Sequence, residues 1–369
     1  ANEMAKKYGS MIKLASEVTD TDLYIPSTFF ALNYLFGKGI PYGKIVEIAG
    51  EESSGKSLIA YNFAYSCQQL GGHVIWVDAE QSWMNSWAQT NGVDPERVTV
   101  VNDTRIENVA DAVADLALYF RSQLTHNEPI LLVIDSVAAM DCADNIDSKM
   151  TDAKAEMGGR AKALYKYFRI RSELFYRLGV TQIYINQLRT ALNVGFGKDN
   201  TTTTGGAALK FYASIRAAFY SGRSVTIKQN GKERKAGKLV TIRLIKNKVA
   251  PPRPTISKCP VYFNPKFHEV GFDRCYALED VLVDTDVIEK TTGGYKLKGK
   301  TLARGEEKFQ KLLEEDDELR RKLLRKAGVN TIGTTKKQLE KIETNLFPVD
   351  GVEYENYSDS EEEEEEDDE

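Results

Sequence analysis

The sequence predicts an α/β protein built on a mainly parallel, twisted sheet flanked by helices, with a small C-terminal α/β domain and an acidic tail. Three observations lead to this fold class. Residues 74–77, 98–101, 131–134 and 183–185 form nearly unbroken apolar runs, which are typical of strands buried on both faces. The segments between these runs are long enough for crossover helices, as parallel pairing requires. A further apolar run, residues 45–49, leads directly into a glycine-rich loop and then a helical pattern.

That loop has the complete G-x-x-x-x-G-K-[ST] spacing of a phosphate-binding loop. Its glycines let the backbone curl so that successive N–H groups point at an oxyanion, and the following helix directs the positive end of its dipole to the same place. We expect Lys56 to reach the β- and γ-phosphates and the Ser57 hydroxyl to ligate Mg²⁺. The predicted nucleotide-binding residues of the loop are Gly50, Glu51, Glu52, Ser53, Ser54, Gly55, Lys56 and Ser57.

Polar residues follow three of the predicted strands. Asp135 ends the 131–134 run in the manner of a Walker B aspartate and is placed to hold the magnesium shell. Glu80 follows the 74–77 run and is a candidate general base for an attacking water. Gln187 follows the 183–185 run, where an amide can sense a γ-phosphate. Because ligands bind outside the carboxyl ends of parallel strands, we expect these side chains to surround one nucleotide.

Composition excludes several classes of protein. No apolar run approaches the roughly 20 residues that cross a bilayer, and no signal-peptide pattern opens the chain, so we expect a cytoplasmic protein without a membrane segment. The four cysteines are scattered without a C-x-x-C pair, and the chain has three histidines. This usage predicts reduced thiols in a reducing compartment and argues against a structural zinc site.

The net charge of −5 conceals two regions of opposite sign. All residues of the segment 359–369 except Ser360 are acidic, and removing these ten charges turns −5 into +5 for residues 1–358. Such a polyanion cannot bury apolar surface, so we expect it to be disordered. Two roles remain open for it: solubility, or competition with a nucleic-acid backbone for basic surface of the folded part.

The sequence also indicates that the chain is divided into domains. The segment 257–272 carries Pro260, Pro265 and Gly271 and is typical of a domain boundary. Short strand signals surround residues 295–297, and a charged helical stretch covers residues 306–326. We therefore divide the chain into a short N-terminal arm (1–20), an ATPase core (21–264), a small C-terminal domain (265–346) and the acidic disordered tail (347–369).

Six blocks of sequence carry a family resemblance. They are Lys44 to Ser57, Val77 to Glu80, Ile134 to Ala139, Ile185 to Arg189, Thr202 to Ser214, and Lys246-Asn247-Lys248. In this order they resemble the RecA recombinases of bacteria and phages, and helicases of the same fold lack the Thr-Thr-Gly-Gly-x-Ala-Leu-Lys-Phe-Tyr block. The resemblance covers the chain from about Tyr8 to Lys300. It implies a RecA-like P-loop ATPase core that uses ATP and Mg²⁺, in which Glu80 is the catalytic glutamate and Gln187 links the ATP site to a DNA-binding loop.

Two DNA-binding loops follow from this resemblance. The loop from Leu188 to about Gly206 is rich in Thr, Gly and Asn, which suits ordering on a phosphate backbone, although alone it is typical of a mobile surface loop. Within it, Leu192 and Phe196 would wedge between bases or pack on sugar, or else form a small local cluster. The second loop, 145–159, leads into a helix with Lys162, Lys166 and Arg169 on one face, for which a solvated basic face is the alternative. The predicted DNA-binding residues are Met157, Gly158, Arg160, Lys162, Arg169, Arg189, Leu192, Phe196, Thr203, Thr204, Gly205 and Gly206.

Lys246 and Lys248 lie in a predicted strand around residues 240–249, where alternation places both side chains on the same side. In the family such a pair reaches the γ-phosphate of the neighbouring subunit. The resemblance therefore implies a helical homo-oligomeric filament with ATP at the subunit interface, in which the lysines stabilise transition-state charge in trans. Lys56, Glu80, Gln187, Lys246 and Lys248 are the predicted catalytic residues.

Two positions depart from the family pattern at the nucleotide base. Trp87 falls where the family has a tyrosine stacked on adenine, and we assign Tyr262 to the nucleotide site with it. Met84 falls where an aspartate accepts from the adenine amino group, so weaker base specificity is expected. The short arm before Tyr8 and the looser match after Lys300 suggest a phage-encoded or otherwise diverged member.

The sequence therefore predicts a DNA-dependent ATPase that polymerises on single-stranded DNA, captures duplex DNA, and performs homologous pairing and strand exchange in recombination and repair. Single-strand-binding and mediator proteins are the expected accessory partners. A ring helicase of the same core is one alternative, but a large accessory domain should then precede the core. A filament or mediator protein without ATP turnover is the other, but it usually lacks the catalytic base or the lysine pair, whereas Glu80, Lys246 and Lys248 are present.

Overall fold

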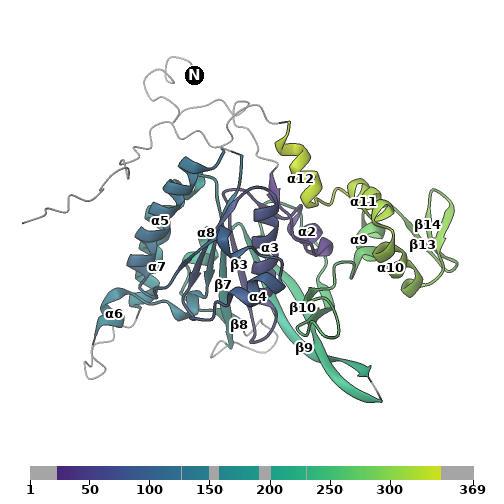
Figure 1. The fold of residues 1–369 in the computed structure, drawn as a ribbon, viewed down its shortest axis with the longest axis horizontal. Helices are drawn as coiled ribbons and strands as arrows, with labels where there is room; N and C mark the ends of the chain where they lie inside the picture. Colours follow the sequence, from purple (N-terminus) through teal and green to yellow (C-terminus); the bar gives the residue numbers. More distant parts are fainter. Residues whose placement is uncertain (1–22, 126, 149–157, 191–200, 230, 342–369) are drawn as a thin grey trace, which may run out of the picture.

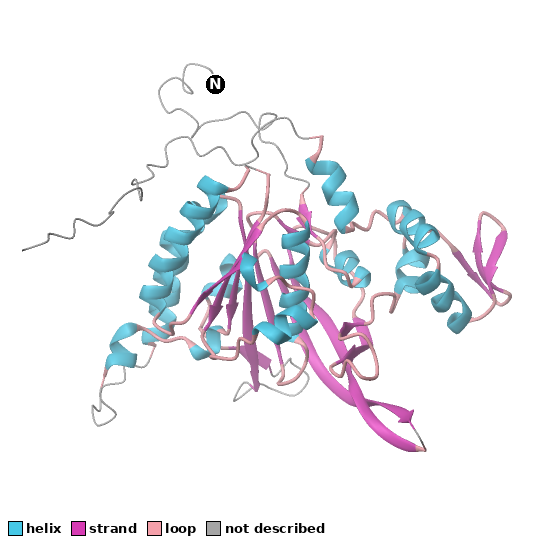
Figure 2. Ribbon diagram, viewed as in Figure 1, coloured by secondary structure: helices cyan, strands magenta, loops and turns pink. Residues whose placement is uncertain are grey.

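The computed structural model of the protein describes residues 23–125, 127–148, 158–190, 201–229 and 231–341. Ten strands of this part form one sheet in the order β12-β11-β10-β9-β3-β7-β6-β4-β5, with β8 paired to β7 (Figures 1 and 2). The predicted α/β fold class with a mainly parallel sheet is confirmed. The parallel strands are β3 (Ile45–Gly50), β4 (His73–Asp78), β5 (Val98–Val101), β6 (Ile130–Asp135), β7 (Val180–Thr190) and β9 (Ile215–Gln229).

Helices cover both faces of the parallel strands because successive strand residues point to opposite faces. On one face, α3 (Lys56–Gln69) packs in an apolar cluster with Val46 and Val74. On the other face, α5 (Ile106–Gln123) and α7 (Gly159–Arg177) pack with Ile75 and Ile130, and Figure 1 shows these two helices side by side. The inner strands are therefore buried on both faces, as their apolar runs predict. β5 differs: its four residues are only half-buried, because it lies at the edge of the sheet.

Shorter elements occupy the connections between the strands. They are α4 (Asn85–Thr90) and the 3₁₀ helix η3 (Pro95–Arg97) between β4 and β5, the 3₁₀ helix η4 (Val137–Ala139) and α6 (Ala143–Asp147) between β6 and α7, and β8 (Thr201–Thr203) and α8 (Ala208–Tyr212) between β7 and β9. The predicted loop 145–159 thus begins inside α6, and its residues 149–157 lie outside the described part of the chain.

β7 runs further than the sequence indicates. The polar pair at residues 186–187 was expected to end this strand, but β7 continues to Thr190 and pairs with β8, so that Leu188 faces Thr203 and Arg189 faces Thr202. The predicted loop from Leu188 onward therefore contains two paired strand segments, residues 188–190 and 201–203. Their ladder hydrogen bonds satisfy backbone groups that a loop would leave exposed. Residues 191–200, which include Leu192 and Phe196, lie outside the described residues.

Beyond β9 the sheet becomes antiparallel. β9 and β10 (Lys232–Asn247) form a long two-stranded ribbon, and β11 (Ile256–Tyr262) and β12 (Gly271–Phe272) extend the sheet. Phe272 of β12 stacks on Phe29 with ring centroids 5.4 Å apart. The predicted boundary after residue 264 therefore falls inside the edge of the sheet, because β12 lies beyond it and still pairs with β11. The four-part division of the chain stays a prediction.

The remaining elements lie beside the sheet (Figure 1). The predicted helical stretch over 306–326 forms two helices, because Asp316 interrupts the run and its side chain accepts a hydrogen bond from the Leu319 N–H at 2.9 Å as an N-cap. These elements are β1 (Tyr24–Ile25), α2 (Phe30–Phe36), β2 (Ile40–Pro41), α9 (Leu278–Asp284), β13 (Glu289–Thr291), β14 (Gly294–Leu297), β15 (Lys300–Ala303), α10 (Glu306–Glu315), α11 (Asp317–Lys326) and α12 (Ile332–Leu339).

Candidate active site and DNA interface

The phosphate loop begins where β3 ends. Gly50 lies between Gln187 of β7 and Phe219 of β9 in the register of the sheet. A Cβ atom at Gly50 would lie 2.6 Å from Ser54 Oγ and 2.7 Å from the Phe219 carbonyl oxygen, so a side chain there would fill the loop. Gly55 has a φ of 85°, in the left-handed region that favours glycine, and it directly precedes α3. The two glycines therefore let the loop fold closely over the end of β3.

Lys56 is held inside this loop by a neutral acceptor. Its Nζ donates to the Glu51 carbonyl oxygen at 2.7 Å, and Ser54 Oγ donates to the same oxygen at 2.8 Å. Burial lowers the pKa of Lys56, while the carboxylates of Asp135 and Glu80 act in the opposite direction. A phosphate oxygen is a stronger acceptor for an ammonium than a peptide carbonyl. The lysine is therefore placed to exchange the Glu51 oxygen for an oxygen of a bound nucleotide.

Asp135 and Glu80 lie at the ends of neighbouring strands. The Asp135 carbonyl oxygen accepts from the Ala79 N–H at 2.9 Å and from the Glu80 N–H at 3.3 Å. Burial raises the pKa of the Asp135 carboxyl to about 6, although the Ser57 hydroxyl hydrogen-bonds to it. Glu80 is exposed, and its carboxylate accepts a hydrogen bond from the Ser136 hydroxyl. One acid is thus buried beside the phosphate loop, and the other faces the space outside the strands.

The oxygens of Asp135 and Ser57 fit a Mg²⁺ site. No group of three or more His, Cys, Asp or Glu in the described residues is arranged to enclose a metal by itself. Mg²⁺ usually keeps several waters and takes one or two protein oxygens together with substrate phosphates. A buried carboxylate with a neighbouring hydroxyl supplies that donor set, and a divalent cation would offset the burial of the Asp135 charge.

Gln187 is tied to a buried polar network through Asn186. Asn186 Oδ1 accepts from the Gln187 N–H at 2.9 Å, and Asn186 Nδ2 donates to Glu47 Oε1 at 3.0 Å and to the Thr204 carbonyl oxygen at 2.9 Å. Glu47 is 1% exposed within β3 and forms an ion pair with Arg216 of β9. The network therefore joins the strand of the phosphate loop, the strand of Gln187 and the residue that follows β8.

Lys246 and Lys248 lie towards the amino ends of β3 and β9, whereas the phosphate loop follows the carboxyl end of β3. Lys246 faces Arg216 in the register, and Arg216 faces Glu47, which is three residues before Gly50 in β3. Lys248 lies further from Gly50, because it follows the end of β10. At about 3.3 Å per residue along a strand and about 4.8 Å between strands, the backbone of Lys248 is roughly 15–20 Å from Gly50. That distance exceeds the reach of a lysine side chain.

The two lysines are close to each other and to α8. Lys246 Nζ donates to the carbonyl oxygens of Lys210 at 2.6 Å and Phe211 at 3.1 Å. Burial, together with the neighbouring charges of Lys248 and Arg216, lowers the pKa of Lys246. The predicted strand around 240–249 ends at Asn247, so strand alternation does not set the direction of Lys248. Instead its backbone N–H donates to the Ser214 carbonyl oxygen at 2.9 Å.

The described base of the β7–β8 hairpin packs on α7. Gly205 has a φ of 90°, and a Cβ atom there would lie 2.7 Å from Leu164 Cδ1, so glycine permits this close approach. Arg189 Nε donates to Thr204 Oγ1 at 3.3 Å. Thr203 is only 8% exposed, so its hydroxyl is not part of the surface that the sequence predicted for DNA.

The beginning of α7 places a second set of residues predicted to bind DNA beside the base of the β7–β8 hairpin. Gly158 precedes the helix, and a Cβ atom at Gly206 would lie 3.1 Å from the Cβ of Ala161, the residue before Lys162. Arg160 forms an ion pair with Asp141 at 3.3 Å. Arg169 lies on the same helix, about 10 Å beyond Lys162 at 1.5 Å per residue, so it is separate from this group.

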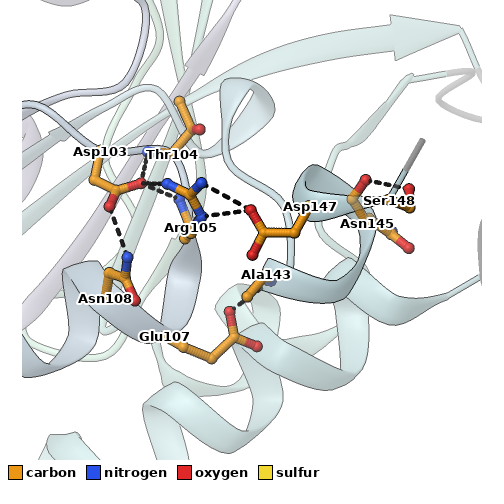
Figure 3. Close-up of polar contacts among 9 residues, drawn as sticks. All are labelled: Asp103, Thr104, Arg105, Glu107, Asn108, Ala143, Asn145, Asp147 and Ser148. Atoms are coloured by element: carbon orange, nitrogen blue, oxygen red, sulfur yellow. Dashed lines mark hydrogen bonds and ion pairs between the residues drawn. The ribbon is translucent and has the colours of Figure 1, made fainter. Parts of the chain in front are cut away.

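Figure 3 shows how the start of the other candidate DNA loop is anchored. Arg105 Nε and Nη2 donate to Asp147 Oδ1 at 3.0 and 2.7 Å, and the Asp103 carboxylate accepts from the Arg105 N–H at 2.8 Å. Glu107 Oε2 accepts from the Ala143 N–H at 2.9 Å. Helix α6 is therefore fixed to the start of α5 directly before residues 149–157. Met157, a predicted DNA contact, lies outside the described residues.

The two aromatic residues predicted to contact the base lie on different elements, Trp87 on α4 and Tyr262 at the end of β11. Trp87 is half-buried on α4, and Met84, directly before α4, is 59% exposed. Tyr262 stacks on the His268 ring with centroids 3.7 Å apart. Phe272 and Val261 lie behind Gly55, 3.0 Å and 3.6 Å from the position of a Cβ atom there.

A cavity of about 280 Å³ lies between α3, the end of α4 and residues 268–274. Phe272 lines this cavity and also packs behind Gly55. Asn62, Gln89 and Asn91 supply polar lining that the sequence did not single out. The network around Glu47 was also missed, although a charged residue inside the apolar run 45–49 was a signal for it.

Every helix in the described part of the chain is too short or too polar to span a bilayer. The family model of the RecA N-terminal domain matches residues 2–264. Proteins named Protein RecA are similar over most of the chain. They include those of Corynebacterium efficiens (32% identical over 345 residues, 92% of this chain and 84% of that protein), Francisella philomiragia (33% over 327 residues, 86% and 84%) and Picosynechococcus (32% over 321 residues, 86% and 86%).

Proposed function

The chain belongs to the RecA family, and from that premise we propose that its phosphate loop, Glu80 and Asp135 form an ATPase site which a second copy of the chain completes. As a member of this family it is a DNA-dependent ATPase that performs homologous pairing and strand exchange in recombination and repair. It binds DNA and forms filaments. The observation that carries the proposal is the position of Lys246 and Lys248 near the amino ends of β3 and β9, away from the phosphate loop at the carboxyl end of β3.

Each residue at the phosphate loop would have one role in hydrolysis. The N–H groups of the loop would hold phosphate oxygens, and Lys56 would leave the Glu51 carbonyl oxygen for the γ-phosphate. Asp135 and Ser57 would hold Mg²⁺, which supplies positive charge to the β- and γ-phosphates when bound. Glu80 would accept a proton from the attacking water, because it is exposed at the strand end next to the buried acid.

Lys246 and Lys248 would act on the nucleotide that a neighbouring subunit binds. Within one chain, roughly 15–20 Å separates the backbones of Lys248 and Gly50, so the Lys248 side chain does not reach its own phosphate loop. In a filament, the same two lysines would approach the γ-phosphate held by the next subunit and stabilise the charge that develops there. ATP would then lie at the subunit interface, and hydrolysis would depend on assembly.

The base of the β7–β8 hairpin is connected to the strands that carry Gln187 and the phosphate loop. Asn186 contacts the Thr204 carbonyl oxygen at the hairpin base, the Gln187 N–H and Glu47. Ordering of the hairpin on single-stranded DNA would therefore act on Gln187 within the subunit. The described contact surface would include Arg189, Gly206 and Lys162, which the packing of the hairpin on α7 brings close together.

Finer features follow from the same proposal. The cavity beside α3 would take the base or ribose of the nucleotide, and the exposed Met84 would contribute little base discrimination. We place the protein in the cytoplasm, with single-strand-binding and mediator proteins as accessory partners. These assignments rest on the family and on the chemistry of the site.

Electron microscopy and ATP hydrolysis, measured on the same samples of full-length protein with single-stranded DNA, test this function. We expect open helical filaments and hydrolysis that single-stranded DNA stimulates. Closed rings would contradict a filament with shared sites and would favour a helicase. Filaments without DNA-stimulated hydrolysis would contradict the catalytic assignment and would favour a structural filament protein.

A further inference from the structure

A buried tyrosine, Tyr61, lies on α3 one helical turn beyond Ser57 of the phosphate loop. Side chains four positions apart share one face of a helix, and long side chains lean back towards its amino end. The Tyr61 side chain therefore extends along α3 towards Ser57 and the end of β6, where Asp135 lies.

Two tryptophans hold the ring of Tyr61 in place. The ring stacks on Trp76 of β4 with centroids 4.6 Å apart and planes inclined by 22°, and it contacts Trp83 with centroids 5.4 Å apart. Trp76 and Trp83 also contact each other, with centroids 5.1 Å apart. Such close packing restricts the ring to one orientation, so the position of its hydroxyl is fixed as well.

Asp78 connects this aromatic cluster to the carboxyl end of β4. It is buried, and its two carboxylate oxygens accept from the Ser82 N–H and the Trp83 N–H, each at 2.9 Å. These bonds turn the chain after β4 so that Trp83 lies against Tyr61. Asp78 also faces Asp135 in the register of β4 and β6, so the two acids end neighbouring strands.

The hydroxyl of Tyr61 lies near these two acids. Burial raises the pKa of Tyr61, and the negative charges of Asp135 and Asp78 raise it further, which indicates that both carboxylates are close. The hydroxyl is therefore neutral, with one proton to donate and two lone pairs that accept. Tyr61 is 4% exposed, yet its hydroxyl forms no hydrogen bond with another residue that the structure describes.

A phenylalanine at this position would satisfy the packing equally well. It would make the same contacts with both tryptophans, whereas a buried hydroxyl without a partner destabilises a folded protein. The hydroxyl therefore requires a partner that the described part of the chain does not supply. A water in the shell of Mg²⁺ suits the position, because Mg²⁺ keeps several waters and makes them strong hydrogen-bond donors.

We propose that Tyr61 is a positioning residue of the ATPase site, whose hydroxyl accepts a hydrogen bond from a water of the Mg²⁺ shell and orients that water beside Asp135. The proposal rests on the proposed function, in which Ser57 and Asp135 hold the metal. Removal of a group that orients the ligands of a metal typically lowers metal affinity or activity by about 10–100-fold. Tyr61 would thus set how much Mg²⁺ the site needs to bind a nucleotide.

Tyr61→Phe tests the hydroxyl alone, because the ring and its stacking contacts stay. The matched control is Tyr42→Phe, which removes the hydroxyl of another buried tyrosine, before the amino end of β3 and away from the phosphate loop. Binding of a fluorescent ADP to the full-length proteins is measured by titration, in EDTA and over a range of free Mg²⁺ concentrations. Urea denaturation without nucleotide measures the stability of each variant.

We expect Tyr61→Phe to need about tenfold more free Mg²⁺ for half-maximal binding of ADP. Its affinity for ADP in EDTA should match that of the parent, its urea midpoint should not fall, and Tyr42→Phe should keep the Mg²⁺ requirement of the parent. An unchanged requirement in Tyr61→Phe, an equal loss of affinity in EDTA, or an equal shift in both variants would each overturn the proposal. A parent protein that binds ADP equally with and without Mg²⁺ would instead contradict the metal site of the proposed function, and this proposal with it.

A positional measurement uses the parent protein. Its tyrosines are replaced by fluorotyrosine, and the fluorine NMR signal of Tyr61 is identified by its absence from the spectrum of Tyr61→Phe. Mn²⁺ with ADP should broaden this signal strongly, because a paramagnetic ion in the place of Mg²⁺ relaxes nuclei close to it. The signal of Tyr42, identified in the same way from Tyr42→Phe, should stay sharp. A Tyr61 signal as sharp as that of Tyr42 would overturn the proposal.

Discussion

The two carboxylates of the nucleotide site lie in contrasting surroundings. Asp135 is buried at the end of β6 with its pKa raised to about 6, whereas Glu80 is exposed and contacts the Ser136 hydroxyl. A buried carboxylate beside a hydroxyl suits a metal ligand, and an exposed one suits an acceptor of protons from water. Residues of the same chemical type thus acquire different tasks from their environments.

Replacement of the exposed acid tests its role as a base. Glu80→Gln should retain ATP and DNA binding but slow hydrolysis by about two orders of magnitude or more, as expected for loss of a general base. Filaments should then persist in ATP instead of disassembling. Glu96→Gln, at an exposed position on η3, is the control and should hydrolyse ATP at the parent rate. Turnover of Glu80→Gln near the parent rate would mean that another group activates the water.

Replacement of the buried acid should change the pH dependence of stability. Because the pKa of Asp135 is higher in the folded protein than in the unfolded chain, its contribution to stability is present at low pH and is lost as the pH rises through about 6. Asp135→Asn removes this loss. Without Mg²⁺ and ATP, the difference in free energy of unfolding between the variant and the parent should therefore be about 1–2 kcal/mol more favourable to the variant at pH 8 than at pH 5. Urea denaturation at both pH values measures this gain, and a pH-independent difference would contradict it.

At the scale of secondary-structure elements, one charged residue connects three strands. Glu47 interrupts the apolar pattern of β3, and its carboxylate pairs with Arg216 of β9 and accepts from Asn186 of β7. Burying such a pair is costly, but removing one partner costs more, because the other charge stays buried without compensation. The inner strands therefore depend on this network as well as on their apolar contacts.

Glu47→Gln should lower the free energy of unfolding by about 3–5 kcal/mol, since it leaves Arg216 without its counter-charge. Urea denaturation measures the change. Arg321→Gln is the control, because the Arg321–Asp317 pair is 71% and 50% exposed, and its loss should cost under about 1 kcal/mol. Addition of Arg216→Met to Glu47→Gln should recover much of the loss. Equal effects of Glu47→Gln and Arg321→Gln would show that the network contributes little.

At the scale of the whole molecule, the groups that would contact one γ-phosphate are distributed over opposite ends of the parallel strands. The loop, Asp135 and Glu80 lie where the parallel strands end, whereas Lys246 and Lys248 lie near the amino end of β3 and β9. The adjoining surface includes Phe211, which is 66% exposed, and Ile245, which is 41% exposed. A basic pair beside exposed apolar side chains suits a contact with a second copy of the chain.

Mixed filaments test whether the lysines act in trans. Lys56→Ala and Lys248→Ala proteins should each hydrolyse ATP poorly, but their mixture should regain activity, because one type of interface then has an intact loop and an intact lysine. A mixture of Lys56→Ala with Glu80→Gln is the control and should stay inactive, since both changes affect the loop side. No recovery over a range of ratios, with mixed filaments verified by electron microscopy, would mean that Lys248 acts within its own subunit.

Local sequence determined the parallel sheet and the loop side of the site. A phosphate loop needs fixed spacings between neighbouring residues, and a buried parallel strand needs an apolar run, so both are readable from short segments. Lys56, Asp135 and Glu80 could be selected for the same reason, because each follows or begins such a segment.

Only the tertiary structure decided the features that depend on strand order and pairing. β5 is half-buried because no strand covers its outer edge, and β7 continues past Gln187 because β8 returns beside it. Glu47 meets Arg216 across 169 positions of sequence. The separation of Lys248 from its own phosphate loop likewise follows from the register of β3, β9 and β10. Such long-range contacts are set by the free energy of packing the whole sheet, and no local pattern in the sequence encodes them.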